Sequence, residues 1–325
     1  MKKYKVLDLF SGAGGLTLGF VQNNFKIMES VDIFQSAVDT YNLNFNKSEK
    51  IKDITDPKIK QNIINNHKNK IDLVIGGFPC QGFSMAGKRS HEDDRNKLYL
   101  HTIEIIKNTN PNVFVLENVK GILSFKDEDG ILIIDKIINT LKDIGYYSDF
   151  VLLDSSKFGV PQKRERVIFI GSKYKNKEKV DLTIQRLTNY SEKIKTVRDA
   201  IEKFENYPEN IEISHIFTKH SEGIIEKLSN LKEGESLYKN YSDAWKRIYY
   251  DKPSPTVKEN HGGVHVHPTQ NRVLTPRELA SLQSFPDDFI FLGSKSNVLK
   301  QIGNAVPVRM SNKIAEIVKK GLLNE

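Results

Sequence analysis

Short apolar runs, most of them bounded by glycine, proline or polar turns, recur through the first half of the chain. Runs with continuous apolar side chains predict buried strands, and longer stretches with apolar positions three and four apart predict helices. Strands are expected at 6–10, 26–31, 71–75, 113–116, 147–154 and 167–171. Helices are expected at 16–22, 98–107 and 132–144. Alternating strands and helices predict an α/β domain built on a doubly wound sheet.

The pattern changes after residue 172. Residues 179–270 are polar and rich in Asn, Lys and Glu, with weak helical signals only near 197–204 and 222–231. A clear helix start follows, because Thr275 suits the N-cap, Pro276 the first turn and Glu278 the capping box. A last helix is expected through Val318. We therefore expect a larger α/β domain formed by 1–178 and 293–325, and a smaller, irregular domain with its hinge at 179–292.

The amino-acid composition excludes several classes of protein. The chain has 325 residues and one cysteine, which excludes a disulfide framework and a multi-cysteine zinc site and favours a reducing, cytoplasmic setting. No apolar stretch of about 18 residues and no signal peptide is evident, so we expect no membrane span. The formal net charge of +8, from 49 basic and 41 acidic side chains, mildly favours a polyanionic partner.

The single cysteine stands in the segment Ile75–Ser84, directly after the strand expected at 71–75. Gly76, Gly77 and Pro79 end that strand and place Cys80 on a turn at its carboxyl end, where open α/β sheets hold their ligands. A lone cysteine is more often an inert buried residue. At such a turn, however, a thiolate is a plausible nucleophile.

A glycine turn follows the first strand. Ser11–Gly15 leads into a helix and a second strand, and Asp32 lies 20 positions after Gly12. This order is typical of the nucleoside-binding βαβ unit of Rossmann-like folds. Because the spacing is Gly-x-Gly-Gly and not the dinucleotide fingerprint, we expect a ligand without a pyrophosphate. A purely structural tight turn is the alternative.

Polar groups end other expected strands. Glu117-Asn118-Val119 follows the strand at 113–116, and Gln162–Arg166 precedes the strand at 167–171. Each could be a solvated rim or surface turn. The pair His265-x-His267 could suggest a metal, but no cysteine and few carboxylates stand near it in the sequence. Polar groups on one face of a strand are the better interpretation, so no metal site is predicted.

Together these segments resemble, in order, the motifs of the C5-cytosine-specific DNA methyltransferases of bacterial restriction-modification systems. The resemblance covers the chain except for about 90 residues in the middle. It rests on Asp8–Gly15, the Pro79-Cys80-Gln81 triplet, Glu117-Asn118-Val119, Gln162–Arg166, Asn271–Phe289 and Gln301–Pro307.

The resemblance implies an S-adenosylmethionine-dependent methyltransferase domain with a mixed sheet, and a target-recognition domain at 179–292. It implies that Cys80 attacks C6 of a flipped-out cytosine, Glu117 contacts N3 and the amino group, Arg166 holds O2 and Arg164 supports the site electrostatically. S-adenosyl-L-methionine is expected at Phe10, Ser11, Gly12, Ala13, Gly14, Gly15, Asp32, Ile33, Asp53, Ile54, Pro79, Leu98, Asn304 and Val306. Double-stranded DNA is expected at Ser84, Lys88, Arg89, Arg247, Thr256, Gly262 and Gly263, with 85–97 as a lid.

Other functions remain to be compared. A transfer-RNA cytosine-5 methyltransferase would share the cysteine and Glu-Asn-Val motifs, whereas the long middle region favours DNA. A non-catalytic DNA-binding regulator on the same fold would not need Cys80, Glu117 and Arg166. A nicotinamide-dependent oxidoreductase lacks support from the glycine spacing. We expect a monomer, and a cognate endonuclease that shares the DNA site without direct contact.

Overall fold

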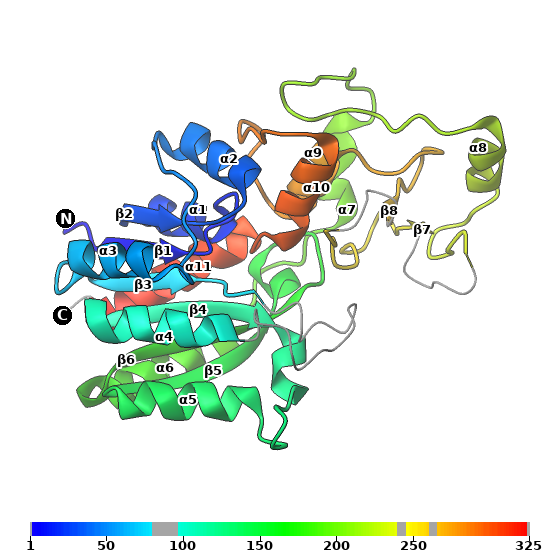
Figure 1. Cartoon of the computed structure of the whole chain (residues 1–325). Helices are drawn as coiled ribbons and strands as arrows, with labels where there is room; N and C mark the ends of the chain where they lie inside the picture. The colour runs from blue at the N-terminus through cyan, green and yellow to red at the C-terminus, as the bar shows by residue number, and fades with distance from the viewer. Residues whose placement is uncertain (1, 80–96, 239–244, 260–264, 324–325) are drawn as a thin grey trace.

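A six-stranded sheet forms the centre of the computed structural model, which describes residues 2–79, 97–238, 245–259 and 265–323. In spatial order its strands are β2 (Lys26–Val31), β1 (Lys5–Leu9), β3 (Leu73–Gly76), β4 (Val113–Val119), β6 (Glu165–Lys173) and β5 (Tyr146–Asp154). The first four are parallel, and β6 runs antiparallel to both of its neighbours. The predicted α/β class with a mixed sheet is therefore confirmed (Figure 1).

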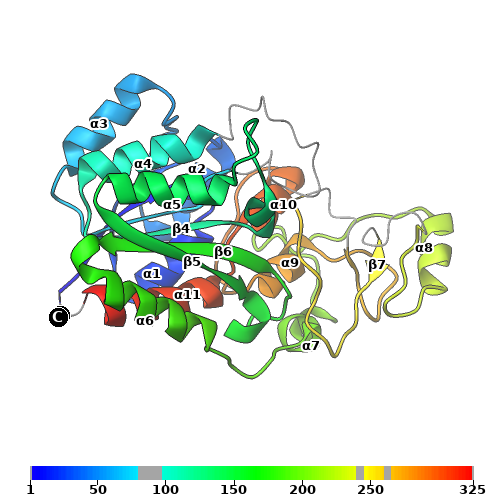
Figure 2. The same ribbon diagram turned by 90° about the horizontal axis from the view of Figure 1, so that it is seen from below.

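Helices cover both faces of the sheet, as Figure 2 shows. One face carries α1 (Gly15–Gln22), α6 (Lys177–Thr188) and α11 (Val308–Val318), and the other carries α3 (Pro57–His67), α4 (Leu98–Thr109) and α5 (Ile133–Asp143). Each face has its own apolar core, because successive strand residues point to opposite sides. Leu73 and Ile75 pack with α1 and α11, whereas Val74 packs with α3, α4 and α5.

Helix α6 corrects the expected domain boundary at residue 178. It packs on β5, β6 and α11, and its Val180 and Leu187 belong to the same core as Ile314. Only one side of this helix is apolar, so its sequence looks polar although it covers the sheet. The sheet domain therefore extends to about residue 188.

Further helices form a third apolar core beside the sheet. It collects Phe285, Phe289 and Phe291 together with Val257 and Ile302. Its elements are α2 (Gln35–Phe45), α7 (Val197–Ile201), α9 (Pro276–Leu282) and α10 (Lys295–Asn304). The predicted capping box of α9 is confirmed, since Thr275 and Glu278 each accept from the other's backbone N–H.

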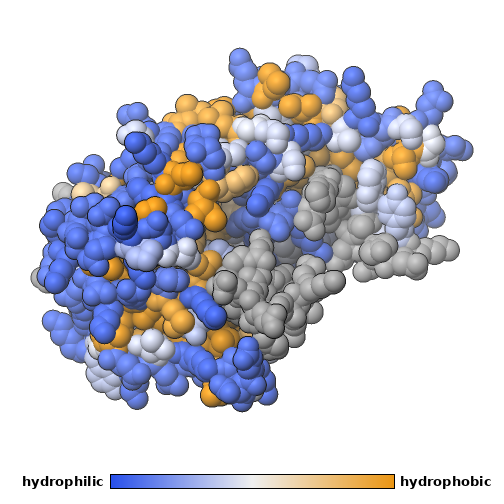
Figure 3. Space-filling model, in the orientation of Figure 1, coloured by the Kyte–Doolittle hydropathy of each residue, from blue (hydrophilic) through white to orange (hydrophobic). Residues whose placement is uncertain are grey.

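Beyond this core the middle region extends away from the sheet (Figure 1). It carries α8 (Glu222–Ser229) and a two-stranded pair, β7 (Lys246–Arg247) and β8 (His265–Val266). Short 3₁₀ turns lie at Lys120–Ser124, Ser155–Phe158, Tyr174–Asn176 and Glu202–Phe204, and a π-helical turn at Lys319–Leu323. Polar side chains dominate the face shown in Figure 3, and within the described ranges no helix has the length and apolarity to cross a membrane.

Candidate active site

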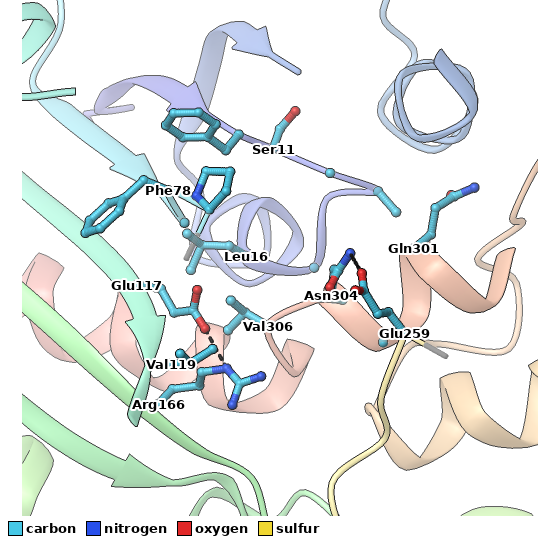
Figure 4. Close-up of a pocket in the computed structure, with 18 of the residues that line it drawn as sticks. Ser11, Leu16, Phe78, Glu117, Val119, Arg166, Glu259, Gln301, Asn304 and Val306 are labelled. Carbon is cyan, nitrogen blue, oxygen red and sulfur yellow. Dashed lines mark hydrogen bonds and ion pairs between the residues drawn. The ribbon is translucent and has the colours of Figure 1, made fainter. Parts of the chain in front are cut away.

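A cavity of about 1270 Å³ opens at the carboxyl ends of the parallel strands. Its walls come from segments far apart in the sequence, which Figure 4 shows converging on one space. The lining includes residues that follow β1 and β2, residues 77–79 after β3, the end of β4, and the start of β6. Residues 256–259 and the end of α10 complete it. This is the edge of an α/β sheet at which ligands bind.

The glycine loop between β1 and α1 has a backbone that most residues could not adopt. Gly12 and Gly14 have φ of 54° and 96°, and Phe10 also lies in the left-handed region. Gly15 packs so closely that a Cβ there would lie 2.5 Å from the Val306 carbonyl oxygen. The glycines are therefore required to close the loop against the segment after α10.

Asp32, at the end of β2, is held by backbone donors. Its Oδ2 accepts from Gly12 N and its Oδ1 from Phe34 N, both at 2.8 Å. Burial raises the pKa of this carboxyl, and the two N–H groups oppose that shift. Lys52 N donates to the Asp32 carbonyl at 2.8 Å, which brings the 52–54 segment beside it. Ile33 is 67% exposed although it lines the cavity, so its side chain is available to a ligand.

Glu117 and Arg166 form an ion pair on the facing wall. Arg166 Nε donates to Glu117 Oε1 at 2.7 Å, and each side chain is only 12% exposed. Gly77 leaves room for this carboxylate, since a Cβ there would lie 2.9 Å from Glu117 Oε2. Asn118 Nδ2 donates to the Phe78 carbonyl at 3.2 Å and ties β4 to the segment after β3. Charged groups of both signs are thus fixed at one point of the cavity.

Cys80 lies outside the described residues, as do Ser84, Lys88, Arg89, Gly262 and Gly263. Pro79, the residue directly before Cys80, lines the same cavity as Glu117 and Arg166. Each predicted cofactor residue except Gly14 also lines that cavity, and Gly14 lies within the loop that does. The sequence motifs therefore converge on one space.

Arg164, predicted to support the site electrostatically, lines the cavity and also connects its walls. Its side chain is buried, with Nη1 donating to the Val257 carbonyl at 2.8 Å and Nη2 to the Gly303 carbonyl at 2.7 Å. Gln162 accepts from Val257 N at 2.8 Å. Arg164 therefore joins the start of β6 to residues 256–259 and to the end of α10, which are three walls of the cavity.

The prediction that Arg247 contacts DNA is contradicted by its surroundings. Its side chain is 5% exposed, and its guanidinium donates inward to five carbonyl oxygens and one amide oxygen. These acceptors belong to Leu228, Leu231, His267, Pro268, Gln270 and Asn271. Arg247 holds the middle region together. Thr256, by contrast, lines the cavity and donates to the Lys163 carbonyl at 2.9 Å.

Sequence reasoning missed several residues of the cavity wall. Lys300 and Gln301 could have been found, because they adjoin or begin the motif that supplies Asn304 and Val306. Glu259 carried no signal, since it stands in the poorly patterned middle region. It lines the cavity and accepts from Asn304 Nδ2 at 2.9 Å (Figure 4).

Comparison with known proteins agrees with this geometry. A family model described as C-5 cytosine-specific DNA methylase matches residues 4–320. The chain is 41% identical over 338 residues to the type II methyltransferase M1.HphI of Haemophilus parahaemolyticus, covering 98% of this chain and 87% of that protein. It is 33% identical over 341 residues to M.Eco47II of Escherichia coli, covering 97% and 78%.

A solved structure has the same fold over the whole length. It is a DNA modification methyltransferase encoded within a prophage (E. coli), and it superposes with a TM-score of 0.78 at 28% identity, covering 99% of this chain and 100% of the other. All of the residues that line the cavity lie within the range that the family model matches. The chain belongs to the C-5 cytosine-specific DNA methylase family and is a DNA (cytosine-5-)-methyltransferase.

Proposed function

We propose that the protein transfers the methyl group of S-adenosyl-L-methionine to C5 of a cytosine flipped out of a short specific sequence in double-stranded DNA. The observation that carries this proposal is the Glu117–Arg166 pair, fixed across the cavity from the glycine loop and beside Pro79. Relatives named type II methyltransferases support a role in restriction-modification. The transfer-RNA and regulator alternatives are not favoured by these names.

The cavity residues fit S-adenosylmethionine. A Cβ on Gly12 would meet no atom within 4 Å, so the loop backbone borders open space that a ligand can enter. Asp32 would accept from the ribose hydroxyls, Ile33 would lie against the adenine, and Asp53 and Ile54 would border its edge. A volume of about 1270 Å³ exceeds that of an ordinary small-molecule pocket, roughly 300–1,000 Å³, and so leaves room for a second reactant.

The chemistry needs a nucleophile, because C5 of cytosine reacts poorly with a methyl donor. The Cys80 thiolate would form a bond to C6, which moves the C5–C6 π electrons to C5. S-adenosylmethionine, when bound, supplies a methyl group on a cationic sulfur that leaves as a neutral thioether. C5 takes the methyl group and then loses its proton to water. The electron pair returns to the C5–C6 bond as the C6–S bond breaks and releases Cys80.

Glu117 and Arg166 would hold the base during these steps. Glu117 contacts N3 and the 4-amino group, and Arg166 donates to O2, so their ion pair fixes the ring before C6 is attacked. The base must leave the stack, because C6 cannot be reached within a duplex, and this costs a few kcal/mol. The middle region would contact the DNA that surrounds the flipped nucleotide.

We further propose that the enzyme acts as a monomer in the cytoplasm, and that a cognate endonuclease recognises the same DNA site without touching it. Neither proposal affects the chemistry of the site. The monomer and the cytoplasm carry over the expectations of the sequence analysis, and the relatives' names as type II methyltransferases support the link to a cognate endonuclease.

Bisulfite sequencing of mixed-sequence duplex DNA tests the proposed function. DNA treated with the protein and S-adenosylmethionine should show protected cytosines in one recurring short context, and Cys80→Ser should abolish the protection. Calorimetry with S-adenosylmethionine provides the control that the protein is intact. Cofactor binding without any protected cytosine would contradict methylation of DNA and favour an RNA substrate or a regulator.

A further inference from the structure

The residues that line the cavity fall into three groups by the segments that carry them, called arms below, and the sulfur of a sulfonium cofactor likewise carries three substituents. Asp32, Ile33 and Asp53 line the arm at the end of β2. Glu117 and Arg166 line a second arm, the one in which the proposed function puts the target base. The third arm lies between the glycine loop and the end of α10 and includes Ala13, Gly303, Asn304 and Glu259.

This division determines where the amino-acid tail of the cofactor must go. If the nucleoside occupies the Asp32 arm and the methyl group points to the base, then only the third arm remains for the tail. The tail carries an α-ammonium and an α-carboxylate. The backbone N–H groups of a glycine loop at a helix start suit the carboxylate. The ammonium needs an anion.

Glu259 is the acidic residue of the third arm. Its side chain is half-buried, and Asn304 Nδ2 donates to its Oε2 at 2.9 Å. In the described part of the chain no ion pair to Glu259 is found, so an amide and not a cation is its partner there. Lys300, the lysine of α10 that lines the cavity, lies over the Phe34 ring at 4.7 Å, toward the Asp32 arm.

The backbone fixes Glu259 in this place. A Cβ on Gly303 would lie 2.3 Å from Glu259 N and 2.5 Å from its Cα, so the two segments are in direct contact. Arg164 bonds to the carbonyls of both Val257 and Gly303. The backbone of Glu259 is therefore held at the cavity wall by contacts independent of its side chain, and Asn304 Nδ2 contacts the carboxylate.

We propose that Glu259 is a cofactor-binding residue whose carboxylate binds the α-ammonium of S-adenosylmethionine. This proposal rests on the proposed function, since it takes S-adenosylmethionine as the cofactor. Glu259 belongs to the middle region, whereas the motif residues of the cavity belong to the sheet domain and to the helices after it. The region that would contact DNA thus supplies one wall of the cofactor site.

The test removes first the negative charge of Glu259, by substitution, and then the positive charge of the α-ammonium, by a change of ligand. Glu259→Gln keeps an acceptor for Asn304, so the wall should stay in place while the anion is lost. The two probes are S-adenosylhomocysteine and its analogue in which hydrogen replaces the α-ammonium, each titrated by calorimetry. Glu222→Gln, an exposed residue at the start of α8, is the matched control.

A bond between an ammonium and a half-buried carboxylate is stronger than a neutral hydrogen bond. The wild type should therefore prefer S-adenosylhomocysteine over the deaminated analogue by about 10- to 100-fold. In Glu259→Gln this preference should fall to within about 3-fold, and Glu222→Gln should keep it. An unchanged preference in Glu259→Gln would overturn the inference, as would an equal loss of affinity for both probes, which indicates a structural role. A wild type that binds neither probe would instead contradict the proposed function.

Discussion

Replacing Arg164 by lysine separates two roles for this residue, chemical support of the reaction and connection of the cavity walls. In the structure Nη1 and Nη2 reach two carbonyls from different segments, those of Val257 and Gly303. A lysine has one ammonium and can serve one of them well. Each hydrogen bond from a charged donor contributes about 1.5–3 kcal/mol. The buried carbonyl left without its donor costs about 1–3 kcal/mol, so we expect Arg164→Lys to lower the free energy of unfolding by about 2–3 kcal/mol.

Urea unfolding, followed by circular dichroism, measures this loss as a lower midpoint of the transition. Arg164→Met should lose more, because both carbonyls then lack a donor. Affinity for S-adenosylhomocysteine should fall along with stability, because Gly303 and Asn304 line the third arm of the cavity, where the amino-acid tail of the cofactor is proposed to bind. Arg309→Lys, an exposed arginine paired with Glu192, is the matched control and should change neither. An Arg164→Lys protein with wild-type unfolding and wild-type cofactor affinity but no methyl transfer would refute this reasoning. It would indicate that Arg164 supports the methyl-transfer reaction directly.

Three further outcomes follow from the geometry. In Gly15→Ala the new Cβ would meet the Val306 carbonyl oxygen at 2.5 Å. Cofactor affinity measured by calorimetry should therefore be at least about 10-fold weaker. In the control Gly223→Ala, where a Cβ meets open space in α8, cofactor affinity should match that of the wild type. Burial raises the pKa of Asp8 from 3.8 to about 7, so the folded state binds the proton more tightly than the unfolded chain does. Stability should therefore fall by roughly 4 kcal/mol as pH rises from about 4 to 7, and Asp8→Asn should flatten that part of an unfolding-midpoint profile. Arg247→Lys should destabilise the protein by about 3 kcal/mol or more. The slope of DNA affinity against salt concentration, measured by fluorescence anisotropy, should stay the same. A smaller slope would indicate that Arg247 does contact DNA.

The sheet could be predicted from the sequence because its strands are buried on both sides. Leu73, Val74 and Ile75 are fully buried, and such continuous apolar runs leave a strong signal. Helices at the surface leave a weaker one. In α3 (Pro57–His67) only Ile63, Ile64 and His67 are buried, and in α6 only three positions are. These helices are stabilised by packing on the sheet, which the local sequence does not reveal.

The site shows the same limit at the level of single residues. Motifs identified Glu117 and Arg166, because a carboxylate and a guanidinium are the groups that the reaction needs. In the structure Arg166 Nε lies 2.7 Å from Glu117 Oε1. A motif also suggested electrostatic support for Arg164, and the middle region suggested DNA contact for Arg247. Both side chains donate to main-chain carbonyls inside the protein. An arginine that binds phosphate and one that binds buried carbonyls look alike in a sequence, because only the surrounding backbone distinguishes them.

The walls of the cavity depend on backbone contacts between remote segments, and this explains why a poorly patterned region can supply a functional group. Residues 256–259 have no periodicity, yet Gln162 and Arg164 bind their main chain, and Gly303 packs against it. Main-chain bonding places a segment without constraining its side chains. Glu259 is therefore positioned by residues that belong to the motifs, although it belongs to none. A chemical group held in this way can only be found after the fold is known.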